Sequence, residues 1–389
     1  MPYRVILKPK EDRRLRDGHP WVYANEVERI EGEGCNGDLA VVCDHAGRFI
    51  GKGYLNHLSK ILVRIFIRDD SEPGKELFKA RIAAADEYRR RLGYDNCYRV
   101  VFGEADDLPA LIVDKYADVL CVQILSLGMD LRRDWIVESL VELFHPRGIY
   151  ERSDAAVRAK EGLPQRKGPL YGEFDLRVVI EENGLRMIAD LENGQKTGYF
   201  LDQKANRFAL RRYTGRRVLD CFCNVGGFAL NAAAAGAEEV TAADVSQRAL
   251  DDVMENARLN GLDGVIRTEC ADVFELLRTY KSEGRRFDTV VLDPPAFCKT
   301  AADVPAATRG YKDINILGMK LVEPGGFLVT SSCSHYMTAV LFEKMLREAA
   351  RESGRRVRLV EIRTQGADHP ALFGAEETAY LKFYVLQIL

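Results

Sequence analysis

Residues 217–237 read RVLDCFCNVGGFALNAAAAGA, which is a short apolar strand, a Gly-Gly turn and the start of an Ala-rich helix. Further apolar strands follow at EVTAADV (239–245), VIRTEC (265–270), FDTVVLDPP (287–295) and GGFLVTSSCS (325–334), with helical stretches between the earlier ones. Strands that alternate with helices in this way predict an α/β fold with a doubly wound, Rossmann-like parallel sheet. Ligands of such sheets bind at the carboxyl ends of the strands, so the residues that end each strand are the candidate site residues.

Four successive strand ends carry residues suited to a nucleoside. The first ends in a Gly-Gly turn, the second in Asp244, the third in Asp272-Val273 and the fourth in Asp293-Pro294-Pro295. Asp244 can accept both ribose hydroxyls, and Asp272 suits an adenine amino group. The G-x-G-x-x-G fingerprint of dinucleotide sites is absent, so no glycine-lined seat for a pyrophosphate is predicted. The pattern favours S-adenosylmethionine (SAM), which has no phosphates. The candidate cofactor-binding residues are Gln203, Asp220, Phe222, Asn224, Gly226, Gly227, Asp244, Asp272, Val273 and Asp293.

The fifth strand ends in Ser332-Cys333-Ser334, which places a thiol beside the expected methyl donor. Ring carbon 5 of a pyrimidine is a weak nucleophile, and adding a thiolate to carbon 6 makes it enamine-like. Cys333 is therefore the candidate nucleophile and Asp293 the candidate that hydrogen-bonds the base. Local sequence equally allows Cys333 to be a small buried residue, and for Cys298 we favour packing over catalysis.

The part of the chain before residue 181 predicts two smaller domains. Residues 1–70 alternate short apolar runs with Gly and Asn turns, as a small β-barrel does. Residues 71–180 combine helical stretches at 76–92 and 134–144 with strands at 98–126, and residues 161–175, rich in Gly and Pro, suggest a loop. The predicted domains are thus 1–70, 71–180 and 181–389.

Composition excludes several classes of protein. The net charge is −3, and no apolar run reaches the roughly 18 residues that a membrane span needs. Nine scattered cysteines without a C-x-x-C pair predict neither a disulfide framework nor a zinc site, and we expect a cytoplasmic protein without a metal. Nucleic-acid binding must then be local, and each basic cluster is about as consistent with a solvated surface. Candidate RNA contacts are Arg13, Arg14, Arg16, Lys299 and Lys312.

Several motifs together resemble the ribosomal RNA large subunit methyltransferase I family. They are NGQKTGYFLDQ (193–203), CFCNVGGF (221–228), DPPAF (293–297), RGYKDIN (309–315) and SCS (332–334), with HPWV (19–22) and GEADDLP (103–109) nearer the N-terminus. The resemblance implies an N-terminal PUA RNA-binding domain, a central α+β domain and a class I SAM-dependent methyltransferase domain. It implies 5-methylcytosine formation in large-subunit ribosomal RNA with Cys333 as nucleophile. Because the target base must leave its stack, naked or partly assembled RNA is the expected substrate. It also implies that the segment 195–199 helps to close the cofactor pocket.

Three other functions are weighed against this one. An RNA methyltransferase acting on a guanine or adenine nitrogen fits Asp-Pro-Pro-x-Phe, which also resembles the corner used for amines. A non-catalytic RNA-binding assembly factor is disfavoured by the intact acidic strand ends, and a nicotinamide-dependent oxidoreductase by the missing glycine fingerprint. The sequence leaves open the modified nucleotide, the proton acceptor and whether the chain forms a homodimer.

Overall fold

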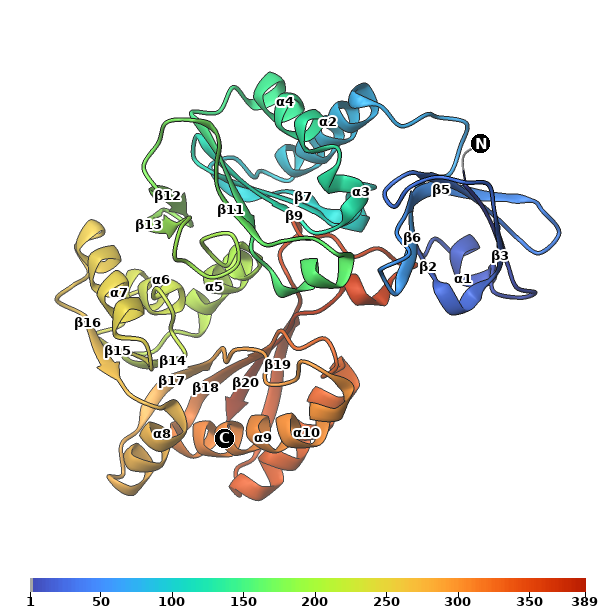
Figure 1. Cartoon of the computed structure of the whole chain (residues 1–389). Coiled ribbons are helices and arrows are strands. Elements are labelled where there is room, and N and C mark those ends of the chain that lie inside the picture. The colour runs from blue at the N-terminus through green and yellow to red at the C-terminus, as the bar shows by residue number, and fades with distance from the viewer. Residues whose placement is uncertain (1–2) are drawn as a thin grey trace. The chain divides into compact units, whose positions relative to one another are not determined.

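The computed structural model describes residues 3–389, and the chain divides into two units, each built from three segments (Figure 1). Unit 1 comprises Met1–Ile180, Ala189–Leu201 and Ala367–Ala379, of which the first two residues lie outside the described part. Unit 2 comprises Glu181–Ile188, Asp202–Gly366 and Tyr380–Leu389. The chain therefore returns to unit 1 twice after residue 180.

The N-terminal part of unit 1 is a six-stranded sheet in the order β2-β6-β5-β4-β1-β3. The short strands expected in residues 1–70 are thus present, and α1 (Arg13–Arg16) follows the first of them. Val5, Leu7, Val42, Leu55 and Val63 are buried and form its core. The strands are β1 (Tyr3–Leu7), β2 (Trp21–Tyr23), β3 (Val27–Glu31), β4 (Leu39–Cys43), β5 (Phe49–Leu55) and β6 (Ile61–Ile67).

The remainder of unit 1 is centred on a five-stranded sheet in the order β11-β10-β9-β8-β7. Helices α2 (Lys75–Arg91) and α4 (Arg133–Phe144) pack together. The rings of Phe78 and Trp135 meet edge to face, with their centroids 5.7 Å apart. Both helices lie where their apolar spacing predicts. The strands are β7 (Cys97–Phe102), β8 (Leu111–Tyr116), β9 (Val119–Ile124), β10 (Gly148–Ser153) and β11 (Arg166–Gly172), and a short helix α3 (Leu127–Asp130) follows β9.

Strand β11 corrects the expected loop at 161–175. It pairs antiparallel with β10 at the edge of the sheet. Most of its side chains are exposed, so the sequence lacks the apolar alternation by which a strand is recognised. Pro169 lies opposite Tyr150 beside a shift in register, a position where the missing amide hydrogen of proline is tolerated.

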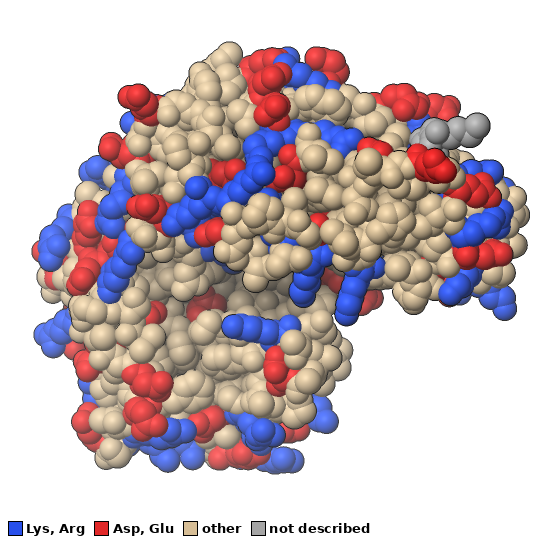
Figure 2. Space-filling view, in the orientation of Figure 1, with Lys and Arg blue, Asp and Glu red and all other residues tan. Residues whose placement is uncertain are grey.

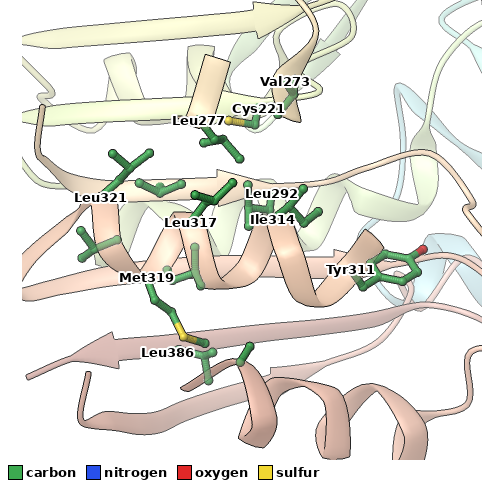
Figure 3. Packing of buried hydrophobic residues seen from close by; sticks show 14 of the residues in the cluster. Cys221, Val273, Leu277, Leu292, Tyr311, Ile314, Leu317, Met319, Leu321 and Leu386 are labelled. Atoms are coloured by element: carbon green, nitrogen blue, oxygen red, sulfur yellow. The ribbon is translucent and has the colours of Figure 1, made fainter. Parts of the chain in front are cut away.

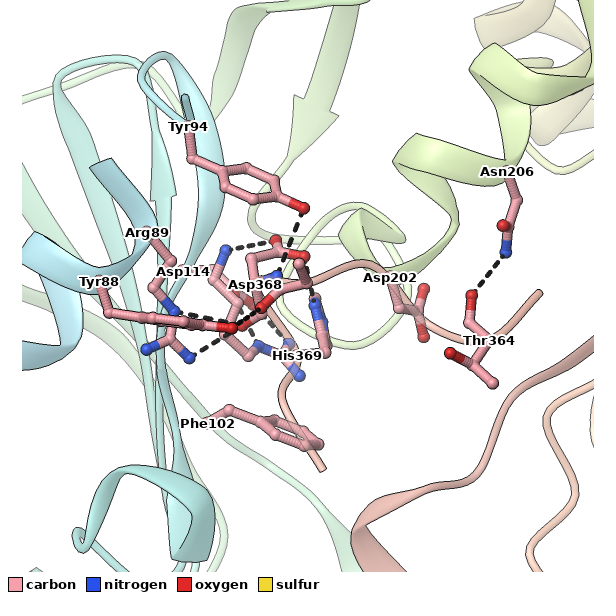
Figure 4. A network of polar contacts seen from close by, with 12 residues as sticks. Tyr88, Arg89, Tyr94, Phe102, Asp114, Asp202, Asn206, Thr364, Asp368 and His369 are labelled. Carbon is pink, nitrogen blue, oxygen red and sulfur yellow. Dashed lines mark hydrogen bonds and ion pairs between the residues drawn. The ribbon is translucent and has the colours of Figure 1, made fainter. Parts of the chain in front are cut away.

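Two segments that belong to unit 1 are fastened by buried charged groups (Figure 4). The guanidinium of Arg89 donates to both carboxylate oxygens of Asp106 and to the main-chain oxygen of Asp368. The amide of Arg99 donates to the Asp368 carboxylate (3.0 Å), and the Arg99 guanidinium donates to Asp114 (2.8 Å). Asp114 also accepts a hydrogen bond from Thr197 (2.5 Å). The segments 189–201 and 367–379 are therefore structural parts of unit 1.

Unit 2 contains a seven-stranded sheet in the order β16-β15-β14-β17-β18-β20-β19. The first five strands in this order run parallel, as predicted, while β20 pairs antiparallel with both β18 and β19. The two C-terminal strands were not predicted. The bounds are β14 (Arg217–Cys221), β15 (Glu239–Asp244), β16 (Ile266–Cys270), β17 (Phe287–Leu292), β18 (Val322–Ser332), β19 (Val357–Arg363) and β20 (Lys382–Ile388).

Helices cover this sheet and bury its apolar side chains. Ile314 and Leu317 of α9 pack with Leu292 of β17 in one buried cluster, which Figure 3 shows from close by. Asp272 and Ser246 accept hydrogen bonds from the first amides of α8 and α7, which fixes where these helices begin. The helices are α5 (Lys204–Leu210), α6 (Gly227–Ala234), α7 (Gln247–Leu259), α8 (Val273–Ser282), α9 (Val304–Leu321) and α10 (Ala339–Ser353).

A hairpin of β12 (Arg177–Glu182) and β13 (Leu185–Asp190) forms the remaining sheet. Among residues 3–389, no helix combines the length and the apolar character that a membrane span requires.

Candidate cofactor and catalytic site

The carboxyl ends of the parallel strands of unit 2 meet at one edge of its sheet. Cys221 of β14 lies in register with Ala243 of β15 and with Leu292 of β17, and Leu292 in turn lies opposite Thr330 of β18. The candidate residues at the ends of these strands therefore share this edge, as the sequence predicts.

The turn after β14 has an unusual backbone. Phe222 (φ 61°) and Asn224 (φ 49°) adopt the left-handed conformation, as does Gly226 (φ 83°). Two hydrogen bonds hold the turn against β15: Cys223 N–H donates to the main-chain oxygen of Ala243 (3.0 Å), and Asn224 N–H donates to the Asp244 carboxylate (3.0 Å). Non-glycine residues in such conformations cost of order 1–3 kcal/mol each and gather at ligand sites, which is consistent with a binding role for this turn.

The two glycines of this turn are required by neighbouring protein atoms. A Cβ at Gly226 would lie 2.8 Å from Leu230 Cδ1, and one at Gly227 would lie 2.6 Å from Arg207 Cδ. Arg207 cannot easily move, because its guanidinium is buried in an ion pair with Glu182 at 2.6 Å. The space that the glycines provide is thus occupied by the protein itself.

Asp220 carries a carboxylate oxygen that lacks a hydrogen-bond partner among the described residues. Its side chain is fully buried, and Oδ2 accepts from the amide of Ala229 in α6 (2.9 Å), whereas Oδ1 is unsatisfied. Burial raises the pKa of Asp220 well above its ordinary value. An orphaned acceptor at this strand end fits a ligand that brings an N–H donor, such as the ammonium group of SAM.

The next two acids already have main-chain partners. Asp244 accepts from the amides of Asn224 and Ser246, both at 3.0 Å, and its remaining lone pairs could meet ribose hydroxyls. Asp272 is exposed and caps α8 through one oxygen, Oδ1. The side chain of Val273 is buried in the core of unit 2, which leaves its main chain for a contact with a nucleoside.

Asp293 is held in place by two side chains. Gln203 Nε2 donates to Asp293 Oδ1 at 2.9 Å, and the hydroxyl of Ser331 donates to the same oxygen. Asn206 donates to the Gln203 amide oxygen (2.7 Å), which fixes the orientation of that amide. Burial raises the pKa of Asp293, while the hydrogen bond from Ser331 opposes the rise. This carboxyl group can consequently hold a proton more readily than an exposed aspartate.

Cys333 lies between two serines that are bound to one tyrosine. Ser332 Oγ donates to the hydroxyl of Tyr311 (3.0 Å), which also lies 2.9 Å from Ser334 Oγ. Both serines and the tyrosine are buried, whereas Cys333 is partly exposed. Ser334 Oγ further accepts from the amide of Cys298 (3.2 Å). The two serines that flank Cys333 are thus held in the protein interior, while Cys333 itself is partly exposed to solvent.

The other thiols near this sheet edge have surroundings typical of packing residues. Cys298 is 3% exposed, and its Sγ lies 3.2 Å from the main-chain oxygen of Thr300. Burial raises the pKa of Cys298, and it raises the pKa values of Cys221 and Cys223 well above the ordinary thiol value. Raised pKa values disfavour the thiolate, so these three cysteines are poor nucleophiles.

Most of the candidate RNA contacts hold ion pairs within the protein. Arg14 pairs with Glu26 (2.7 Å), Arg16 with Asp12 and Asp44, and Lys312 with Glu352 (2.9 Å). The side chains of Arg13 and Lys299 are exposed. Figure 2 shows basic and acidic side chains interleaved over much of one face, with a band of Lys and Arg over unit 1 near β11, a basic region that we did not predict.

Two other residues at this edge of the sheet, Tyr311 and Lys382, were not predicted as site residues. Tyr311 lies within the motif RGYKDIN, which singles out no one side chain. A lone lysine at the start of the apolar strand KFYVLQI was the available signal for Lys382.

Two family matches cover most of the chain. Residues 5–68 match the family described as PUA-like domain, and residues 168–384 match the family described as S-adenosylmethionine-dependent methyltransferase.

Curated relatives match over the full length. "Ribosomal RNA large subunit methyltransferase I" of Shewanella amazonensis is 43% identical, with 100% of each chain covered. The protein of the same name from Aeromonas hydrophila is 43% identical, with 98% of each chain covered.

Solved structures share the fold at low sequence identity. A candidate SAM-dependent methyltransferase from Streptococcus mutans superposes with a TM-score of 0.84 at 19% identity, covering 99% of this chain and 100% of its own. A second solved methyltransferase, in complex with SAH, has a TM-score of 0.86 at 20% identity over the same shares.

Proposed function

This chain belongs to the ribosomal RNA large subunit methyltransferase I family and is SAM-dependent, and from this membership we propose that it methylates carbon 5 of a cytosine in large-subunit ribosomal RNA. The names of the relatives support the substrate class. The arrangement at the ends of β17 and β18 supports the chemistry. A ribosomal RNA substrate also agrees with the cytoplasmic location that we expect.

The residues at the strand ends fit the cofactor. We propose that Asp220 faces the amino-acid ammonium group, that Asp244 binds the ribose, and that Asp272 with the main chain of Val273 meets the adenine. The unsatisfied oxygen of Asp220 and the strained turn at Phe222 and Asn224 support this assignment. When bound, SAM supplies an electrophilic methyl group.

The reaction begins at the partly exposed thiol. Cys333, as the thiolate, adds to carbon 6 of cytosine, and Asp293 hydrogen-bonds the ring so that the charge that develops there is stabilised. With SAM bound, carbon 5 would accept the methyl group that the cofactor supplies, and the bond from that methyl group to the cofactor's sulfur would break. A base then removes the proton from carbon 5. The electron pair of that carbon–hydrogen bond restores the double bond of the ring, and the bond between carbon 6 and the sulfur of Cys333 breaks.

One observation carries this proposal. The hydroxyl of Ser331, two residues before Cys333, hydrogen-bonds to Asp293, so the ends of β17 and β18 are joined beside the thiol. Cys333 is the first residue after β18 and is partly exposed, so its position close to this junction supports a role in the same reaction as Asp293. A methyltransferase that acts on a nitrogen requires no thiol at this place.

The test compares Cys333→Ala with Cys298→Ala in the full-length protein. RNA containing 5-fluorocytosine cannot lose its carbon-5 substituent, so we expect the wild type and Cys298→Ala to form a covalent complex that survives denaturation. Cys333→Ala should form none and should lose methylation of normal RNA. Retention of most methylation by Cys333→Ala would favour a nitrogen target and overturn the proposal.

The RNA must present an accessible base. Removing a base from a helical stack costs a few kcal/mol, and naked or partly assembled RNA reduces this cost. We propose that the PUA-like part of unit 1 and the exposed side chains of Arg13 and Lys299 contribute RNA contacts. Each phosphate contact adds to the salt dependence of binding, so replacing either residue with alanine should make the RNA affinity less sensitive to salt.

A further inference from the structure

Lys382 is a buried cation beside the candidate nucleophile. It is the first residue of β20, lies in register with Ser332 of β18, and is 7% exposed. The six residues that follow it in the strand are mainly apolar. Lysine is rarely buried without an ionic partner, because removing an ammonium group from water is costly.

The ammonium group of Lys382 is bound to main-chain oxygens. Nζ donates to the carbonyl oxygen of Ser334 at 2.6 Å and to that of Tyr380 at 2.7 Å. Among the described residues, Lys382 makes no salt bridge to a carboxylate. These contacts fix the turn that carries Cys333, since Ser334 follows it directly, but they leave the positive charge without a permanent counter-ion.

The charges that face this ammonium group come from two thiols. Burial lowers the pKa of Lys382 to about 8, and the charges that Cys333 and Cys298 would carry as thiolates oppose that fall. Lys382 is therefore largely protonated at neutral pH. Of the other titratable groups nearby, Asp303 acts on Cys298, and Tyr311 is affected by Cys333.

The positive charge of Lys382 can stabilise a reactive thiolate at Cys333 but is less effective at Cys298. The Cys298 thiol is buried against the carbonyl of Thr300, and its pKa is raised by burial. Cys333 is partly exposed at the end of the catalytic strand. A neighbouring ammonium group stabilises a thiolate and can lower the apparent pKa of a cysteine by one unit or more.

We propose that Lys382 is a positioning residue for the methylation reaction. It holds the Ser334 carbonyl and thereby the turn that carries Cys333, and its ammonium group stabilises the Cys333 thiolate. This inference rests on the proposed function, in which Cys333 is the nucleophile. The ammonium group acts through Cys333 and makes no contact with substrate. It supplies the counter-ion at the moment when the thiol loses its proton, and again when the thiolate leaves carbon 6.

The test measures the reactivity of individual thiols in the full-length protein. Iodoacetamide alkylation is followed against pH by peptide mass spectrometry in the wild type, Lys382→Met, Lys382→Gln and Lys382→Arg. We expect the pH midpoint for Cys333 to rise by about one unit in the two neutral variants, so that alkylation at pH 7 slows roughly tenfold, and to stay near the wild-type value in Lys382→Arg. The exposed Cys270 is the internal reference and should not change.

Kinetics provide the second readout. The neutral variants should lose about tenfold in kcat for RNA methylation, with little change in KM for SAM, and Lys382→Arg should recover most of that loss. Should Lys382→Met fail to fold, the pair Lys382→Gln and Lys382→Arg decides the result. An unchanged Cys333 midpoint in the neutral variants would overturn the inference.

The two proposals fail in different ways. If Cys333→Ala retained methylation, the proposed function would fail whatever the alkylation profiles show. If Cys333→Ala lost methylation while the neutral variants kept the wild-type midpoint and kcat, only the role of Lys382 would fail.

Discussion

Asp220 carries a carboxyl group into a place that water does not reach. One oxygen accepts the amide of Ala229, and the other has no partner among the described residues. Ionising such a group costs stability, which explains the strong rise of its pKa. At this site the free protein therefore keeps a carboxyl group that lowers its stability, as the proposed contact with the cofactor would explain.

Asp220→Asn should be more stable than the wild type without cofactor and should bind SAM less tightly. The folded-state pKa of Asp220 is raised, so its protonated form contributes fully to the stability of the protein below the ordinary carboxyl pKa. This contribution to stability is lost as pH rises through the raised value. The advantage of the variant should therefore grow with pH and reach roughly 1–2 kcal/mol at pH 8. Urea unfolding at pH 5 and pH 8 and calorimetric titration with SAM measure both effects.

The exposed Asp263 provides a matched control. Asp263→Asn should change neither the stability nor the SAM affinity measurably, because a surface substitution rarely changes stability by more than about 0.5 kcal/mol. Unaltered SAM affinity in Asp220→Asn would contradict the assigned role of Asp220.

At the scale of elements, the turn between β14 and α6 depends on glycine because of its protein neighbours. Gly227→Ala should destabilise the protein by about 1–3 kcal/mol, because the new methyl group would meet Arg207, whose ion pair with Glu182 resists movement. Gly264→Ala is the control, since a Cβ there has no atom within 4 Å and the backbone needs no left-handed conformation. Thermal unfolding compares them, and equal stabilities would contradict this account.

The end of β18 depends on α9 through one hydroxyl group. Tyr311→Phe removes the partner of both Ser332 and Ser334, so we expect a loss of about 1–2 kcal/mol in stability. The turn at Cys333 should also become less well fixed, which lowers kcat by about tenfold. Tyr336→Phe, an exposed tyrosine in the same segment, should retain both stability and activity. A variant Tyr311→Phe with full kcat would show that the turn is held without the tyrosine.

Most of the parallel strands were predictable because they are largely buried runs followed by a residue suited to ligand binding, although β16 is buried only at Ile266. Strand β11 was missed because its exposed side chains give no apolar alternation. The role of Lys382 was missed for a different reason. It depends on the pairing of Lys382 with Ser332, fifty positions earlier, and no local pattern encodes such a register.

At the scale of the whole molecule, unit 1 is completed by segments far along the chain. The division into domains at residues 1–70, 71–180 and 181–389 remains a proposal. Segments 189–201 and 367–379 belong to unit 1, although this division would include them in the C-terminal domain. Arg89 and Arg99 read as ordinary charged residues in the sequence, since their partners at Asp368 lie some 270 positions away. Their burial could only be learned from the structure.

Asp368→Ala should destabilise unit 1 by about 3 kcal/mol, because it removes the partner of the Arg99 amide and of His369. Although burial opposes ionisation, His369 and the Arg99 amide lower the pKa of Asp368. Its contribution is thus present above the ordinary carboxyl pKa and is lost as pH falls through the lowered value. Hydrogen exchange should show faster exchange in β7 and β8.

The exposed Glu376 lies in the same segment and serves as the control. Glu376→Ala should leave the exchange of β7 and β8 at wild-type rates. If Asp368→Ala did the same, the buried network would not be what fastens segment 367–379.

The late entry of segment 367–379 sets the order in which the nascent protein can mature during synthesis. The buried arginines of α2 and β7 lack their Asp368 contacts until translation has passed this segment. Unit 1 therefore cannot complete its buried polar network until this returning segment has been synthesised, however early its first 180 residues emerge.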